Sequence, residues 1–268
     1  MLRADTVLAR DGIAVADVAC RHTAGRGDED EHSARHGIVF VRRGCFVRVA
    51  EGAEELLDAT AAYCMNPGAE VRYDHPHDDG DDCTALFLSP RLAAALWGGD
   101  PQLPARALRT SSRIDLEHRL LLAAARRGAD PDEQVERAIA LGAAALEGAD
   151  ARRVAAGRPA TARARRALAD GAREALVADP DRSLLDLAGA LAVSPHHLSR
   201  VFASVVGHTI SRHRMILRAR AALERVAGGE RDLARLAADV GFADQSHLAR
   251  VVRRETGRPP SALRALLA

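Results

Sequence analysis

The apolar positions in the first third of the chain come in short runs, without the 3.6-residue repeat of an amphipathic helix. Turn residues such as Gly44, Gly52 and Gly68 separate these runs. The runs that predict strands are residues 13–20, 38–41, 45–50, 61–65, 69–73 and 84–88. Many short strands at this spacing favour a sandwich or a barrel.

The pattern becomes helical from residue 113. An apolar stripe predicts one helix that ends near Gly128 and a second that begins at Pro131. Such a pair joins two domains, forms a dimer seam or packs within its own domain, and the pattern does not choose between these roles. The Gly- and Pro-containing stretch 151–161 is typical of a linker.

The remaining sequence predicts a succession of helices with recognisable caps. The first covers about 162–177, and a long one covers about 209–227. Short polar residues precede the apolar stripes of the others and are expected to cap them. These cap residues are Ser183, Ser194, Asp232 and Asp244.

Part of this helical region is repeated fifty positions later. Leu198, Arg200, Val201, Gly207 and Arg214 recur as Leu248, Arg250, Val251, Gly257 and Arg264. Each copy predicts a short helix, a tight turn and a second helix with an exposed arginine, which indicates a helix-turn-helix. The connecting helix spans roughly 27 Å, which with its turns approaches the ~34 Å between successive major-groove faces. The repeat therefore predicts two DNA-reading units on one rigid body.

Charge is divided unevenly between the two halves. Residues 159–268 hold 18 Arg against 11 Asp plus Glu, a formal +7, whereas residues 1–158 carry −6. The basic half is therefore expected to face a polyanion, and the acidic half to sense a signal or dimerise. The chain shows neither an apolar run of roughly 20 residues nor a secretory pattern. With four cysteines, this predicts a cytoplasmic protein with reduced thiols and no membrane partner.

A set of residues in the repeat is shared with a known family. The set comprises segment 194–202 (Ser-Pro-His-His-Leu-Ser-Arg-Val-Phe), Gly207, segment 218–223, Gly241-Phe242, Gln245-Ser246-His247-Leu248, Gly257 and segment 259–264. Over about 100 residues, it resembles the AraC/XylS family of transcriptional regulators. Upstream, segment 40–46, Asn66-Pro67-Gly68 and His75-Pro76 resemble the cupin-type sensor arm of that family.

The resemblance implies an α+β multidomain fold. A cupin-like β-barrel or jelly roll with a helical hairpin precedes an all-α double helix-turn-helix. The expected domains are a sensor at 1–110, the helical pair at 111–150, the linker at 151–161 and the DNA-binding domain at 162–268. The chain departs from the family at Leu248, Val252 and Thr256, where phenylalanine is usual, so looser packing of the second unit is expected.

Residues on the N-terminal exposed face of each second helix are expected to meet base edges. They are His196, Ser199 and Arg200 in the first unit and Gln245, Ser246, His247 and Arg250 in the second. The resemblance points to the same faces. Arginine suits guanine and glutamine suits adenine, although Arg200 and Arg250 have a phosphate clamp as their alternative role.

Neighbouring residues are expected to play other parts. His197 is expected to pack against the turn, because it aligns with His247 while its neighbours fill the exposed face. Arg212, Arg214 and Arg218 near the connecting helix are either phosphate contacts or solvated charges.

Histidines and cysteines gather in the strand-rich region. His75, His77 and Cys83 are candidate ligands for a metal such as zinc and resemble a fragment of the cupin metal pattern. We favour the alternative without a metal, in which Cys45, Cys64 and Cys83 are small buried strand residues. A thiol redox switch and a small organic effector inside the barrel stay open.

The predicted function is that of a sequence-specific DNA-binding transcriptional regulator, controlled by an unknown signal and without catalytic residues. The resemblance implies promoter DNA, RNA polymerase and a second copy of the chain as partners, with activation as the output. The residues themselves do not identify the effector or separate activation from repression. The alternatives are a cupin-like metal-dependent enzyme fused to a DNA-binding domain, and a regulator that acts without a signal.

Overall fold

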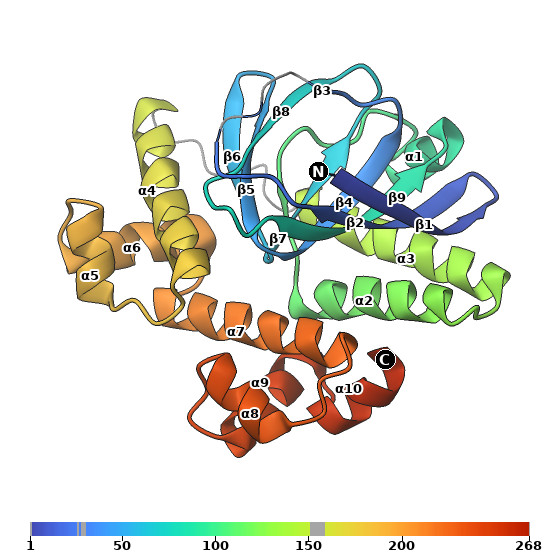
Figure 1. Cartoon of the computed structure of the whole chain (residues 1–268). Coiled ribbons are helices and arrows are strands. Elements are labelled where there is room, and N and C mark those ends of the chain that lie inside the picture. Colours follow the sequence, from blue (N-terminus) through green and yellow to red (C-terminus); the bar gives the residue numbers. More distant parts are fainter. Residues whose placement is uncertain (1, 26, 28–30, 151–158, 268) are drawn as a thin grey trace.

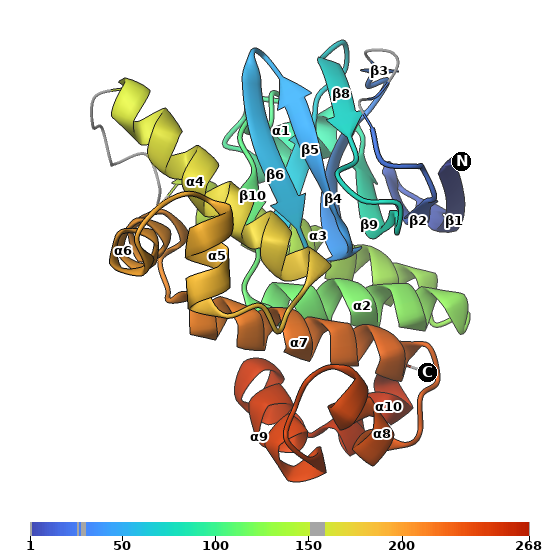
Figure 2. The ribbon, with the colours of Figure 1, turned by 60° about the vertical axis from the view of Figure 1, so that its left-hand side comes forward.

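The computed structural model of the chain describes residues 2–25, 27, 31–150 and 159–267 (Figure 1). Its N-terminal half is a layered β-structure with two long helices along one face (Figures 1 and 2). The helices of residues 210–267 lie beyond this pair, whereas the helix Pro159–Ala178 lies beside the strands. Of the predicted fold class, a strand-rich N-terminal part followed by an all-helical C-terminal part is confirmed, and the strand-rich part is called the barrel below.

The described strands form two antiparallel sheets. One sheet has the order β1-β2-β9-β4-β7-β10, and the other has the order β3-β8-β5-β6. The strands are β1 (Leu2–Arg10), β2 (Ile13–Cys20), β3 (Glu31–His32), β4 (His36–Arg43), β5 (Cys45–Ala50), β6 (Ala53–Asp58), β7 (Ala61–Met65), β8 (Glu70–Asp74), β9 (Asp81–Leu88) and β10 (Leu108–Arg109). All six predicted strands are among them.

Strand β4 is covered on both faces. Ile38 and Phe40 pack with apolar residues of the helices, whereas Val39 and Val41 belong to the core shared with Phe46 and other residues of the second sheet. All four are at most 4% exposed. A strand buried on both faces is a continuous apolar run instead of an alternating one, which is the pattern seen here.

Several elements lie outside the predicted runs, namely β1, β3, β6, β10 and helix α1 (Pro90–Leu96). Strand β1 is mostly exposed and is held by backbone pairing with β2 from Leu2↔Cys20 to Arg10↔Ile13. Strand β6 carries the polar Glu54 and Glu55 ahead of its two leucines and pairs with β5. Such strands depend on a neighbour's backbone groups more than on apolar side chains, so hydrophobic runs do not reveal them.

Helices α2 (Ser112–Arg126) and α3 (Pro131–Asp150) cover the six-stranded sheet. Leu121 of α2 and Leu146 of α3 share a core with Ile38 and Leu86 of the sheet. These contacts are packing within the N-terminal half, one of the three roles that the sequence left open. Leu116, also on α2, joins the core of the last helices instead, so α2 is packed between the two halves.

The C-terminal helices form two clusters around α7. They are α4 (Pro159–Ala178), α5 (Leu184–Ala190), α6 (Pro195–Val206), α7 (Ile210–Ala227), α8 (Leu233–Asp239), α9 (Gln245–Thr256) and α10 (Pro260–Leu267). Ile210 and Leu217 of α7 pack with α4 to α6, whereas Leu223 and Val226 pack with α8 to α10. One helix therefore belongs to both helix-turn-helix cores.

The predicted caps of these helices are confirmed. The side chains of Ser183, Ser194, Asp232 and Asp244 each accept a backbone N–H of the first turn. Helices α6 and α9 both end at a glycine in the left-handed conformation, with φ 85° at Gly207 and φ 75° at Gly257.

The expected looser packing of the second unit is wrong for the residues that carried it. Leu248 and Val252 are 0% and 1% exposed. The Thr256 hydroxyl donates to the Val252 carbonyl oxygen at 2.8 Å, so its polarity is satisfied without an aromatic ring.

Residues 151–158 of the predicted linker 151–161 lie outside the described residues. Helix α4 begins at Pro159, so the last three residues of that stretch are helical. Of the helices that the structure describes, none has the length and apolar character that a bilayer crossing requires.

Candidate nucleic-acid interface

Helix α6 presents one polar face to solvent. Leu198, Val201 and Phe202 form its buried stripe. On the opposite side, His196 and Arg200 are exposed and Ser199 is half-buried. The cap at Ser194 fixes where the helix begins, so these three predicted base-reading residues fall within its first two turns.

Helix α9 repeats this arrangement. Leu248, Val251 and Val252 are buried, and the exposed side carries the predicted residues Gln245, Ser246 and Arg250. His247 is half-buried, and its ring meets that of Phe242 edge-on with 5.2 Å between centroids. Packing of this kind restricts the orientation of the His247 ring.

His197 and His247 occupy equivalent positions of the repeat but differ in environment. His197 is exposed, so the expectation that it packs against the turn is wrong. The packed histidine is His247, because Phe242 precedes its helix, whereas Val193 stands at the corresponding place of the first unit.

The two repeated arginines have their charges available. Across the residues that the structure describes, neither Arg200 nor Arg250 forms an ion pair or a side-chain hydrogen bond. Both are exposed near the first turn of a capped helix. Guanidinium groups in this state can approach a phosphate or a guanine edge without breaking a bond within the protein.

The arginines of α7 considered for phosphate contacts are engaged within the chain. Arg212 forms a bidentate ion pair with Glu255, with distances of 2.5 Å and 3.0 Å between its two Nη atoms and the carboxylate oxygens. Arg214 donates to the carbonyl oxygen of Arg182 at 2.6 Å, and Arg218 pairs with Asp181. These three side chains join α7 to α9 and to the segment between α4 and α5, so they are not the free solvated charges that the sequence suggested.

Comparison with known proteins identifies the domain that these C-terminal helices form. A family model described as a helix-turn-helix domain matches residues 187–265, from α5 into α10. The C-terminal region is an AraC-type helix-turn-helix domain. The chain is thus a DNA-binding transcriptional regulator, as predicted from the sequence. No curated protein sequence matches the chain at a significant level.

Solved structures resemble the chain at low identity. ToxT from Vibrio cholerae has 11% identity and a TM-score of 0.38, covering 97% of this chain and 99% of its own. A transcriptional regulator with an AraC-type DNA-binding domain from Chromobacterium violaceum has 21% identity and a TM-score of 0.38, covering 40% and 96%. A Cupin 2 conserved barrel domain protein from Salinispora arenicola has 16% identity and a TM-score of 0.28, covering 33% and 76%. We draw no conclusion about function from likenesses of this size.

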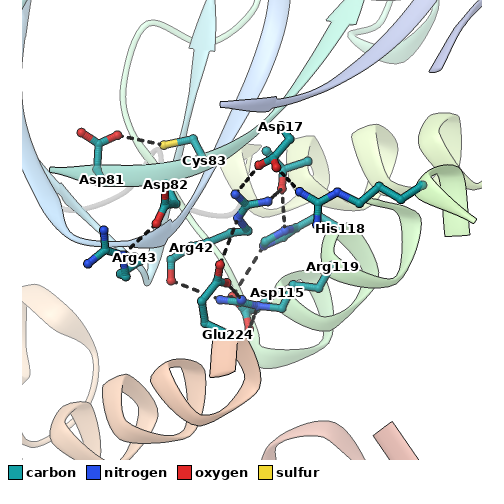
Figure 3. A network of polar contacts seen from close by, with 12 residues as sticks. Asp17, Arg42, Arg43, Asp81, Asp82, Cys83, Asp115, His118, Arg119 and Glu224 are labelled. Atoms are coloured by element: carbon teal, nitrogen blue, oxygen red, sulfur yellow. Dashed lines mark hydrogen bonds and ion pairs between the residues drawn. The ribbon is translucent and has the colours of Figure 1, made fainter. Parts of the chain in front are cut away.

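The AraC-type domain is joined to the barrel by buried charges (Figure 3). Arg119 of α2 lies at the centre: it bonds Asp115 at 3.2 Å, pairs with Glu224 of α7 and donates to the carbonyl oxygen of Arg42 at 3.2 Å. Arg42 in turn pairs with Asp17 of β2. Strand, hairpin helix and AraC-type domain are therefore connected through one polar network, the Arg119 network.

Electrostatics fix the protonation states within this network. Burial alone raises the pKa of Asp115, but Arg119 and Arg220 outweigh it and hold that pKa well below its usual value. Burial lowers the pKa of His118 to about 4, against the pull of Asp115. The neutral ring has two partners, because one nitrogen lies 3.5 Å from Asp115 and the other 3.3 Å from the Thr84 hydroxyl.

A second polar connection lies at the other end of α7. Arg173 of α4 bonds the Asp58 carboxylate at 2.9 Å and the Leu56 carbonyl oxygen at 3.1 Å, both on β6. His213 of α7 approaches the same carboxylate at 3.5 Å. Burial raises the pKa of Asp58, but Arg173 and His213 outweigh it and hold the pKa well below its usual value.

The predicted metal candidates are only partly brought together. Of His75, His77 and Cys83, only His75 belongs to the Cys/His group that the structure assembles within the described residues, which is Cys20, His22 and His75. Cys83 donates instead to an Asp81 carboxylate oxygen at 3.4 Å. Sequence reasoning missed Cys20 and His22 because they are 53 or more positions from His75, and only strand pairing brings them near.

The other cysteines behave as buried strand residues. Burial raises the pKa of the Cys45 and Cys64 thiols to about 12. Burial, with Asp81 beside it, also raises the pKa of Cys83 well above its usual value. These thiols are protonated at neutral pH and therefore unreactive, which agrees with the structural role favoured from the sequence.

Proposed function

We propose that this regulator binds promoter DNA by placing the N-terminal faces of α6 and α9 in two successive major-groove segments. The base-reading residues in this proposal are His196, Ser199, Arg200, Gln245, Ser246, His247 and Arg250. The observation that carries it is the pair Arg200 and Arg250, which are equivalent in the repeat, exposed and unpaired among the described residues, while the arginines of α7 are bonded. Helix α7, with 18 residues, sets a separation of roughly 27 Å between the units before turns are added.

The test is protection mapping on the genomic DNA that flanks the coding region, followed by the variants Arg200→Ala and Arg250→Ala. Each variant is expected to relax specificity at its own half-site, which is the major-groove segment that its helix contacts. The cost is about 1–3 kcal/mol if the arginine contacts a base. A phosphate contact instead weakens binding at all sequences and lowers the salt slope by about one. The matched control is Arg91→Ala, which removes the same charge from an exposed position on α1. Unchanged sequence-specific protection in the double variant would refute the proposal.

We infer that the signal enters through the barrel and acts on the connections between barrel and AraC-type domain. The Arg119 network and the Asp58–Arg173 pair both span these parts. A pocket of about 250 Å³ opens between the barrel and the AraC-type domain, and this contact region is called the seam. The residues that line the pocket include Asp17, Arg126 and Glu224. A signal that favours one arrangement of this seam would change how α6 and α9 are presented to DNA.

A homodimer, contact with RNA polymerase, an activating output and a cytoplasmic location remain predictions that come from the sequence. Sedimentation of the full chain with and without DNA tests the dimer. The alternative of a metal-dependent enzyme fused to the DNA-binding domain is favoured by one observation, the Cys20, His22 and His75 group. This alternative requires a catalysed reaction whose rate falls when one of these three residues is substituted.

A further inference from the structure

We propose that Cys20, His22 and His75 bind a divalent transition metal, with Asp81 as the fourth ligand. The ligand atoms of the first three residues all lie within 4.8 Å of one another. None of the three belongs to the DNA-binding face or to the Arg119 network, and the proposed function does not use them.

Two of the separations between ligand atoms come close to those around a tetrahedral ion. Bonds of about 2.3 Å to sulfur and about 2.0–2.1 Å to nitrogen place neighbouring ligand atoms roughly 3.4–3.6 Å apart. Cys20 Sγ and His75 Nε2 are 3.4 Å apart, and His75 Nε2 is 3.1 Å from Asp81 Oδ2. His22 is exposed, so its ring can rotate and bring its ligand nitrogen closer to the ligand atoms of Cys20 and His75.

The fold itself brings these residues together. Cys20 and Asp81 are directly paired across β2 and β9. Two backbone hydrogen bonds of 2.8 Å between Gly25 and His75 hold the segment after His22 against the loop that carries His75. Gly80 is required there, because a Cβ at its position would come within 2.1 Å of the Cys20 carbonyl oxygen.

The donor types select the class of metal. One thiolate and two imidazoles suit a borderline-soft ion such as Zn²⁺, whereas Mg²⁺ and Ca²⁺ prefer oxygen ligands alone. Asp81 is itself oriented for this role, since its Oδ1 accepts from Cys83 while its Oδ2 faces His75. Outer contacts of this kind orient metal ligands in proteins.

The proposed metal site adjoins the seam with the AraC-type domain through Arg21, the residue that follows Cys20. Arg21 donates to the carbonyl oxygens of Cys20 and Asp81 at 2.8 Å and 3.0 Å, and to the Asp82 carboxylate at 2.6 Å. Arg21 and Asp82 also line the seam pocket together with Glu224. Metal binding therefore acts on the side chains that face α7. This coupling, unlike the site itself, rests on the proposed function.

The first experiment measures metal binding by the full chain after removal of bound metal with a chelator. Titration with Co²⁺ is expected to give one ion per chain, with visible bands of tetrahedral cobalt, a thiolate charge-transfer band, and loss of both on adding Zn²⁺. His22→Ala changes an exposed residue and should leave the fold intact while weakening affinity at least about tenfold, the loss that even outer contacts produce. Cys20→Ser should remove the charge-transfer band.

The matched control is His77→Ala, which alters the other histidine considered as a ligand from the sequence pattern. It should keep one tetrahedral Co²⁺ per chain with unchanged affinity. Absence of tetrahedral cobalt in the unaltered chain overturns the proposal. So does an affinity that falls with His77→Ala but not with His22→Ala.

Protection mapping with and without Zn²⁺ separates the site from its coupling. Protection that changes with Zn²⁺ in the unaltered chain but not in His22→Ala supports both. Protection that ignores Zn²⁺ while cobalt binds overturns the coupling and leaves the site and the DNA-binding function standing. Cobalt binding without any protected DNA overturns the proposed function and the coupling together, and still supports the site.

Discussion

Asp58 shows how strongly a single buried charge ties the two halves of this protein together. It ends strand β6 with 0% exposure and holds Arg173 of α4 at 2.9 Å. Burying either charge without the other is costly, because no water replaces the missing partner. The pair therefore stabilises the docked arrangement mainly by making its separation unfavourable.

We expect Asp58→Ala to lower the free energy of unfolding by about 3 kcal/mol or more, because it leaves the buried Arg173 with Asp170 as its remaining ion-pair partner. Urea denaturation followed by circular dichroism measures this. The comparison is Glu133→Ala, which breaks the exposed pair with Arg137 and should cost less than about 0.5 kcal/mol. Equal losses of unfolding free energy in the two variants would show that the buried pair stabilises the protein no more than the exposed pair does.

Helix α9, the second of the two helices proposed to read DNA, depends on the Asp244 cap for its first turn. Asp244 accepts the backbone N–H of His247 at 2.6 Å, and Gln245 and Ser246 lie within the turn that this bond closes. A helix start that frays would release the very residues proposed to meet base edges. Stability and recognition therefore meet at one side chain.

Asp244→Ala is expected to cost about 1 kcal/mol of folding free energy. Protection of the second half-site should also weaken more than that of the first. Asp244→Asn keeps an oxygen acceptor in the same place, so it should behave like the unaltered chain in both denaturation and protection mapping. A half-site effect of the same size in the alanine and asparagine variants would contradict this role of the cap.

In the whole molecule, the polar connections between barrel and AraC-type domain make stability depend on pH. His118 and His213 are both buried in these connections, and burial lowers the pKa of each. In the unfolded chain a histidine titrates near 6.5. As the pH falls, the unfolded chain therefore binds protons before the folded chain does.

We expect the contribution of His118 and His213 to the free energy of unfolding to be largest above about pH 6.5 and to fall as the pH drops toward 4. His118, whose pKa is lowered to about 4, accounts for about 3 kcal/mol of this loss. Urea denaturation at intervals between pH 7.5 and 4.5 measures the slope. His118→Gln should flatten it, and an unchanged slope in that variant would mean that His118 is not the titrating group.

The sequence alone predicted the elements whose cause is local. The caps at Ser194 and Asp244 and the apolar stripes of α6, α7 and α9 depend on residues within one or two turns, so a linear pattern reveals them. The charge asymmetry and the fifty-residue repeat likewise pointed to DNA before any fold was known.

Tertiary structure decided what depends on distant segments. Edge strand β1 exists through pairing with β2, and the hairpin α2–α3 packs on the sheet because Leu121 and Leu146 meet Ile38 there. Cys20 stands beside His75 only because β2 pairs with β9. Contacts between residues far apart in sequence leave no periodic trace along the chain, so these arrangements could be seen only once the strands were paired and the layers closed.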